Sequence, residues 1–117
     1  MLLAFVLEER SLQRTAVVGH AEHSGPLVVT EAALAEACGV LVRTYARPAT
    51  EVAQRLSRLL ESSTFSAWDE ELAQTALALL IRYPHLGLPD CLLAARASLG
   101  DAVFTFDRRL AAAIQQL

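Results

Sequence analysis

The stretch "GLPDCLLAARASLGDAVFTFDRRL", residues 87–110, decides the fold of this chain. It holds two apolar runs, "CLLAARA" and "AVFTF", and an aspartate adjoins each of them: Asp90 precedes the first and Asp107 follows the second. The first run has the composition of a helix that ends at Gly100. The second has the β-branched and aromatic residues of a buried strand. A helix that leads into a strand, with another helix after it, is typical of a parallel α/β sheet.

The remainder of the chain alternates in the same way. Short β-branched or aromatic runs predict strands, and longer runs with a helical spacing of apolar residues predict helices. The expected strands are "LVVT" (27–30), "TFSAW" (64–68) and "AVFTF" (102–106), and the expected helices cover 11–24, 31–46, 49–63, 69–83, 90–100 and 107–116. The sequence therefore predicts one domain over residues 1–117, an α/β three-layer fold with a short parallel sheet flanked by helices.

Composition narrows the classes of function. The net charge is −3, so the molecule as a whole does not attract polyanions. All ten basic residues are arginine, and a polyanion such as RNA would have to bind to a local arginine patch or to a bound cation. Cys38 and Cys91 lie inside apolar helical patterns with no CxxC spacing, which indicates two buried thiols in a reducing compartment. The apolar start is short for a signal peptide, and no run could span a bilayer. We expect a soluble, cytoplasmic protein.

Carboxylates follow the expected strands, and the carboxyl ends of parallel strands carry function in such sheets. Asp107 comes directly after the third strand, Asp90 opens the helix that leads to it, and Glu31 and Glu36 follow the first strand. Carboxylates that converge from separate segments, without histidine or cysteine, suit Mg²⁺ or Mn²⁺. Such ions hold phosphate oxygens and activate water. The alternative is that Asp90 and Asp107 only cap the helices they precede.

The same stretches resemble the PIN-domain ribonucleases, especially the VapC-type toxins of toxin–antitoxin pairs. That family carries an Asp-Ala-Leu-(Leu/Ile)-Ala-Ala run and, about a dozen and a half residues later, a strand that ends in Thr-Phe-Asp before basic residues. Here these are Asp90-Cys-Leu-Leu-Ala-Ala and Thr105-Phe106-Asp107-Arg108-Arg109. A second resemblance is "VVTEAALAEACGVLVR", similar to the family's strand and following helix, whose acidic residue falls by register on Glu36.

The resemblance implies a PIN-like fold and a metal-dependent endoribonuclease that acts as the toxin of a toxin–antitoxin system. Asp90, Asp107 and Glu36 would be the catalytic residues and would hold one or two Mg²⁺ or Mn²⁺ ions, and the Thr105 hydroxyl would support the site. The partners it implies are an RNA substrate, a cognate antitoxin protein and a second copy of the chain in a homodimer.

The resemblance also implies a departure at the start of the chain. The family opens with a strand ending in Asp-Thr-Asn or Asp-Thr-Ser, which an apolar helix follows. This chain begins with "LLAFVL", which is similar to that helix. The first strand and its aspartate therefore have no counterpart, and we expect them to be encoded upstream of Met1.

Several alternatives remain open at this point. Arg96, Arg108 and Arg109 could contact RNA phosphates, or they could form a solvated face. His20 and His23 have i, i+3 spacing but no third ligand, which favours a solvated helix face. The chain could be a catalytically impaired PIN-like protein that acts through antitoxin binding or dimerisation. A generic nucleotide-binding module is less well supported, because the chain has no glycine-rich first turn.

Overall fold

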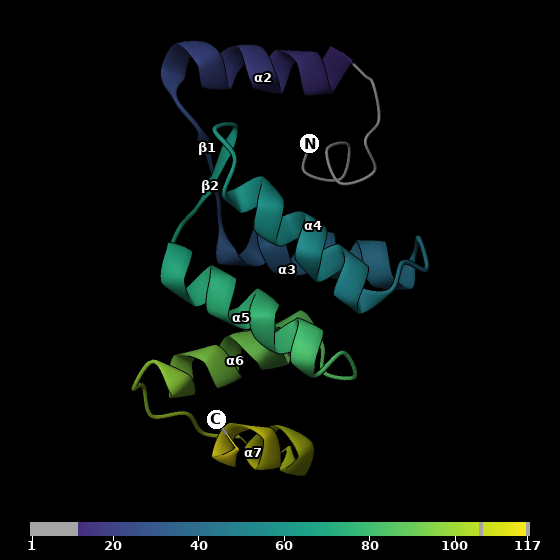
Figure 1. The fold of residues 1–117 in the computed structure, drawn as a ribbon, viewed down its shortest axis with the longest axis vertical. Coiled ribbons are helices and arrows are strands. Elements are labelled where there is room, and N and C mark those ends of the chain that lie inside the picture. Colours follow the sequence, from purple (N-terminus) through teal and green to yellow (C-terminus); the bar gives the residue numbers. More distant parts are fainter. Residues whose placement is uncertain (1–11, 106, 117) are drawn as a thin grey trace.

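The computed structural model describes residues 12–105 and 107–116 of the chain. In this part, two short strands stand among six helices (Figure 1). In chain order the elements are α2 (Leu12–Ser24), β1 (Leu27–Val29), α3 (Glu31–Arg43), α4 (Ala49–Leu60), β2 (Phe65–Ala67), α5 (Glu70–Arg82), α6 (Leu88–Ser98) and α7 (Arg108–Gln115). The predicted "LLAFVL" helix lies outside the described residues.

The two described strands form a parallel pair. Leu27 aligns with Phe65 and Val29 with Ala67, and α3 and α4 make the crossover between the two strands. Both strands begin at the same end of the sheet, because the helical connection carries the chain from the carboxyl end of β1 back to the end at which β1 starts. The predicted α/β fold, a short parallel sheet flanked by helices, is confirmed.

Local sequence signals place most helix ends. Thr30 caps α3, since its side chain accepts a hydrogen bond from the Ala33 N–H. Asp69, the first residue of the helix expected over 69–83, caps α5 and accepts a hydrogen bond from the Leu72 N–H at 3.1 Å. Pro84 follows the end of α5, as expected for a residue that cannot continue a helix. The helix predicted over 90–100 begins two residues earlier, at Leu88, because Pro89 is accepted in a first turn.

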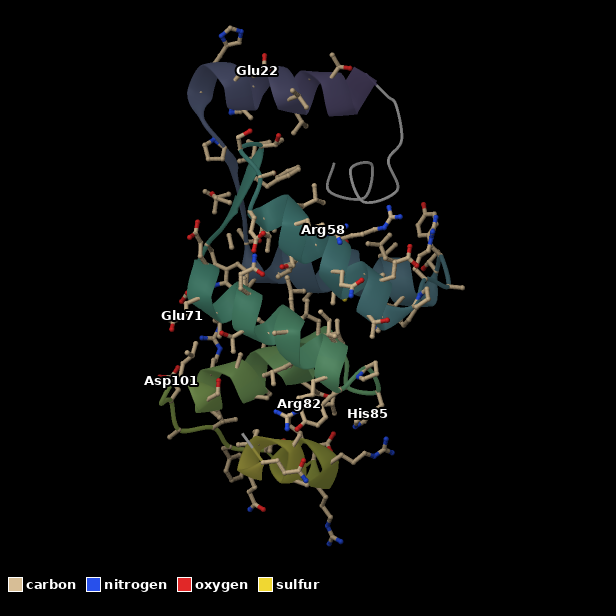
Figure 2. The ribbon with its side chains drawn as sticks, in the orientation of Figure 1. Glu22, Arg58, Glu71, Arg82, His85 and Asp101 are labelled. Carbon is tan, nitrogen blue, oxygen red and sulfur yellow. The ribbon has the colours of Figure 1, made fainter. Side chains whose placement is uncertain are left out.

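One core joins the helices and the strand pair. Its fully buried large side chains come from five different helices: Leu34, Leu41, Val52, Leu56, Leu77, Leu80, Cys91 and Leu110. No polar or charged side chain is buried among the described residues. Figure 2 shows charged groups such as Glu22, Arg58 and Glu71 on the outside of their helices. Burial of apolar surface therefore holds the fold together, and the ionisable groups are left for solvent or ligands.

The prediction of a strand at 102–106 is wrong for the residues that the structure describes. Residues 101–105 have no regular secondary structure, and the described sheet contains only β1 and β2. This segment runs from α6 to α7, at the opposite end of the molecule from α2 and away from β1 and β2 (Figure 1). A β-type sequence becomes a strand only where a neighbouring backbone can accept its hydrogen bonds. Here Phe104 is instead 80% exposed.

No helix in the described part of the chain is both long and apolar enough to cross a lipid bilayer.

Candidate active site

The three carboxylates singled out in the sequence lie on three different helices. Glu36 is exposed in the middle of α3, and Asp90 is half-buried in the first turn of α6. Asp107 is exposed and precedes α7. Helix α6 packs against both α3 and α7, so the helix of Asp90 is the neighbour of the other two helices.

Asp107 has a clear local role. Its Oδ1 accepts hydrogen bonds from the backbone N–H groups of Arg109, at 2.9 Å, and Leu110, at 3.2 Å, so it is the N-cap of α7. The Thr105 hydroxyl in turn accepts a hydrogen bond from the backbone N–H of Asp107 at 3.1 Å. The chain therefore fixes the backbone at Asp107 from both sides, and one oxygen of its carboxylate is committed to the helix.

Asp90 has a different local environment. The N-cap of α6 is Gly87, and no side chain caps the helix. The carboxylate of Asp90 thus sits in the first turn of a helix whose leading N–H groups have no side-chain acceptor, where the helix dipole stabilises negative charge. The structure therefore does not show Asp90 as the cap of α6. It does show Asp107 as the cap of α7.

The described residues contain no group of three or more His, Cys, Asp or Glu side chains that could hold a metal ion. Glu36, Asp90 and Asp107 are therefore not gathered into such a group here. His20 and His23 lie exposed on α2, which agrees with a solvated helix face. The donor chemistry of the three carboxylates fits a hard divalent cation, but their arrangement in this structure does not provide its coordination shell.

Of the three arginines near these carboxylates, two are exposed and one is held in an ion pair. Arg108 and Arg109 are exposed in the first turn of α7. Arg96 is engaged, because its Nη2 donates to both carboxylate oxygens of Glu31 at 2.7 Å. A phosphate at Arg96 would have to compete with that carboxylate. The sequence places Glu31 after the first strand, but no local pattern links it to Arg96, which lies 65 positions away.

The family of the chain is decided by comparison with known proteins. A family model described as the PIN domain matches residues 1–114. The chain belongs to the PIN-domain family. The match covers all described elements from α2 to α6 and nearly all of α7, including Glu36, Asp90 and Asp107. Neither the curated proteins nor the solved structures contain a match to this PIN domain. The family relationship therefore rests on the domain match, which indicates a nuclease in general terms.

Proposed function

We propose that this PIN domain is a metal-dependent endoribonuclease and the toxin component of a toxin–antitoxin system. The observation that carries the proposal is the match to the PIN domain over residues 1–114, which includes the three acidic positions. The packing of α6 between α3 and α7 supports it, because the helices that bear Glu36, Asp90 and Asp107 are neighbours.

In this proposal Glu36, Asp90 and Asp107 would hold Mg²⁺ or Mn²⁺. A divalent ion held by carboxylates supplies positive charge to phosphate oxygens and lowers the pKa of water. The chain contributes the positions of the donors: the Thr105 hydroxyl accepts a hydrogen bond from the backbone N–H of Asp107, and Asp90 lies in the first turn of α6. Arg108 and Arg109, which are exposed beside Asp107, would contact RNA phosphates.

RNA cleavage with matched variants tests this function. The full chain would be incubated with a labelled single-stranded RNA in Mg²⁺, in Mn²⁺ or in EDTA. We expect cleavage that requires the metal and that Asp90→Asn lowers by about 100-fold or more, the range for loss of a group that acts in the transition state. Asp101→Asn is the matched control, since Asp101 is an exposed aspartate beyond the end of α6 and outside the family's pattern. Cleavage in EDTA, or equal cleavage by Asp90→Asn, would contradict the proposal.

A second candidate function is a catalytically impaired PIN domain that acts through an antitoxin or through dimerisation. The observation that favours it is that the three carboxylates form no metal-holding group among the described residues. Exposed apolar side chains such as Val28, at 63% exposed, and Phe104 could serve a protein partner. Light scattering of the purified chain would show a dimer, and co-purification with an antitoxin would show the partner. A stable complex without metal-dependent cleavage would favour this function over the first.

A further inference from the structure

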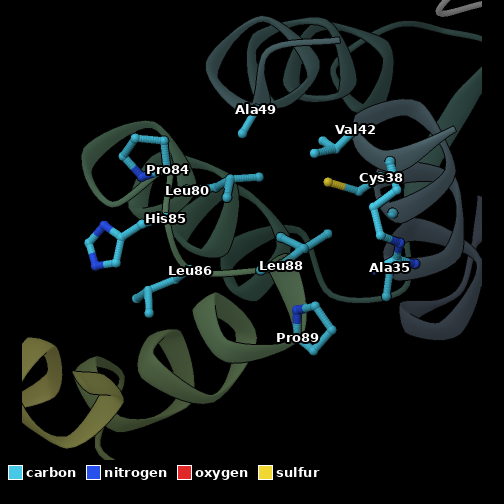
Figure 3. Close-up of a pocket in the computed structure, with 13 residues that line it drawn as sticks. Ala35, Cys38, Val42, Ala49, Leu80, Pro84, His85, Leu86, Leu88 and Pro89 are labelled. Carbon is cyan, nitrogen blue, oxygen red and sulfur yellow. The ribbon is translucent and has the colours of Figure 1, made fainter. Parts of the chain in front are cut away.

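A cavity of about 270 Å³ lies between α3, α4 and the loop that joins α5 to α6 (Figure 3). Its walls are largely apolar, and its lining includes Ala35, Val42, Ala49, Leu80, Leu86 and Leu88. The volume approaches the lower end of the range for small-molecule sites, so a short organic molecule would fit. None of Glu36, Asp90 and Asp107 lines the cavity, although Ala35 and Pro89, which do, are the chain neighbours of Glu36 and Asp90.

One permanent cation lies at this apolar cavity. Arg43 comes from the last turn of α3, and its guanidinium folds back over Gly39, one turn earlier on the same helix. A Cβ added at Gly39 would fall 2.6 Å from Arg43 Nη2, so the absence of a side chain at Gly39 makes room for the guanidinium.

No anion balances this cation at the cavity. Within the described part of the chain, no carboxylate forms an ion pair with Arg43, and no acidic residue is among the described residues that line the cavity. Cys38 also lines the cavity, but burial raises the pKa of its thiol to about 11, so at neutral pH it remains uncharged. His85 lies at the exposed rim. A guanidinium without an anionic partner, beside an apolar cavity, is suited to a ligand with one anionic end.

We propose that this cavity binds a small ligand with a short apolar body and a single carboxylate, which pairs with Arg43. A carboxylate matches the one permanent cation in charge, and its two oxygens match the planar fork of a guanidinium. A phosphate would bring up to two negative charges against that single cation. The same chemistry occurs in a free short-chain organic acid and in the C-terminal carboxylate of a peptide that ends in an apolar residue. The experiment therefore includes a probe for each source.

Binding to the full chain by calorimetry tests the proposal with pairs of probes that differ only in charge. The pairs are hexanoate with hexanamide and N-acetylleucine with its amide. Because Arg43 is exposed and solvent screens its charge, we expect at least one acid to bind about two- to five-fold more tightly than its amide. A preference confined to hexanoate identifies a free acid as the ligand type, and one confined to N-acetylleucine identifies a peptide terminus.

Three variants locate the binding. Arg43→Gln should abolish the preference for the acid, and Arg47→Gln is the matched control, because Arg47 pairs with Glu51 and does not line the cavity. Ala49→Leu places a larger side chain in the cavity and should weaken binding of the acid and of the amide equally. Equal binding of acid and amide, no binding of either, or a preference that survives Arg43→Gln would overturn the proposal. If a variant does not fold, the comparison of acid with amide on the unaltered chain still decides it.

Discussion

Arg96 on α6 and Glu31 at the start of α3 form an ion pair in which one guanidinium nitrogen lies 2.7 Å from both carboxylate oxygens. The pair joins the helix that carries Asp90 to the helix that carries Glu36. Both side chains are more than a third exposed, so solvent screens much of their attraction. The pair is thus a modest electrostatic link between two helices that the apolar core already holds together.

The stability of this link can be measured directly. Arg96→Gln should lower the free energy of unfolding by about 0.5–1 kcal/mol at low salt, and less at high salt. Urea unfolding of the two single variants, Glu31→Gln and Arg96→Gln, and of the double variant forms a mutant cycle. A coupling energy of zero at low salt would show that the pair contributes nothing.

Substitutions at Asp107 separate its two roles. Asp107→Ala removes the N-cap of α7 and should cost about 1 kcal/mol of stability, whereas Asp107→Ser keeps a capping oxygen and should cost little. If Asp107 also holds the metal, both variants should lose RNA cleavage. Cleavage by Asp107→Ser at the rate of the unaltered chain would leave Asp107 as a helix cap only. Thermal melts and the RNA assay on the same samples give both values.

Divalent metal should stabilise the folded chain. A ligand that binds only the native state adds about 2.7 kcal/mol when its free concentration is about 100 times its Kd. We expect the midpoint of thermal unfolding to rise in Mn²⁺ relative to EDTA, and to rise much less for Asp90→Asn. Identical midpoints of the unaltered chain in Mn²⁺ and EDTA would count against a metal site.

The two buried thiols make stability depend on alkaline pH. Burial raises the pKa of Cys38 to about 11 and, together with the nearby charge of Asp90, that of Cys91 to about 12, from an ordinary value of 9.0. Between pH 9 and these values the unfolded chain has released the thiol protons while the folded chain retains them. Stability should therefore fall as pH rises, by about 1.4 kcal/mol per pH unit for each thiol. Cys38→Ala should show a shallower fall above pH 9 in urea titrations, and an unchanged slope would contradict this account.

Gly39 offers a test that couples stability to the cavity. Gly39→Ala should stabilise α3 by about 0.5–1 kcal/mol through the lower entropy of the unfolded chain, less the cost of moving the Arg43 guanidinium. The same variant should reduce the preference of the cavity for an acid, since it displaces the cation. Melting curves and calorimetry on this variant report the two effects separately. A preference for the acid that does not change would show that the resting position of Arg43 does not matter.

The sequence by itself indicated the helices, the two runs that became strands, and the family. The helical spacing of apolar residues, Asp69 as a cap and Pro84 as a stop are local signals, and they act over a few residues without reference to the rest of the chain. The runs at 27–30 and 64–68 became β1 and β2 because each had the other as a neighbour. The residues around Asp90 and Asp107 were enough to indicate the PIN-domain family, which the domain match confirmed.

Only the tertiary structure decided what depends on distant partners. The run at 102–106 has the composition of a strand but meets no strand in the described structure, and Phe104 stands exposed. Whether Glu36, Asp90 and Asp107 share one site depends in the same way on how three helices pack, which no spacing in the sequence encodes. The Glu31–Arg96 pair and the Arg43 cavity also join segments far apart in the chain. Hydrogen bonds and charges need a partner in space, and the packing of the apolar core sets where that partner lies.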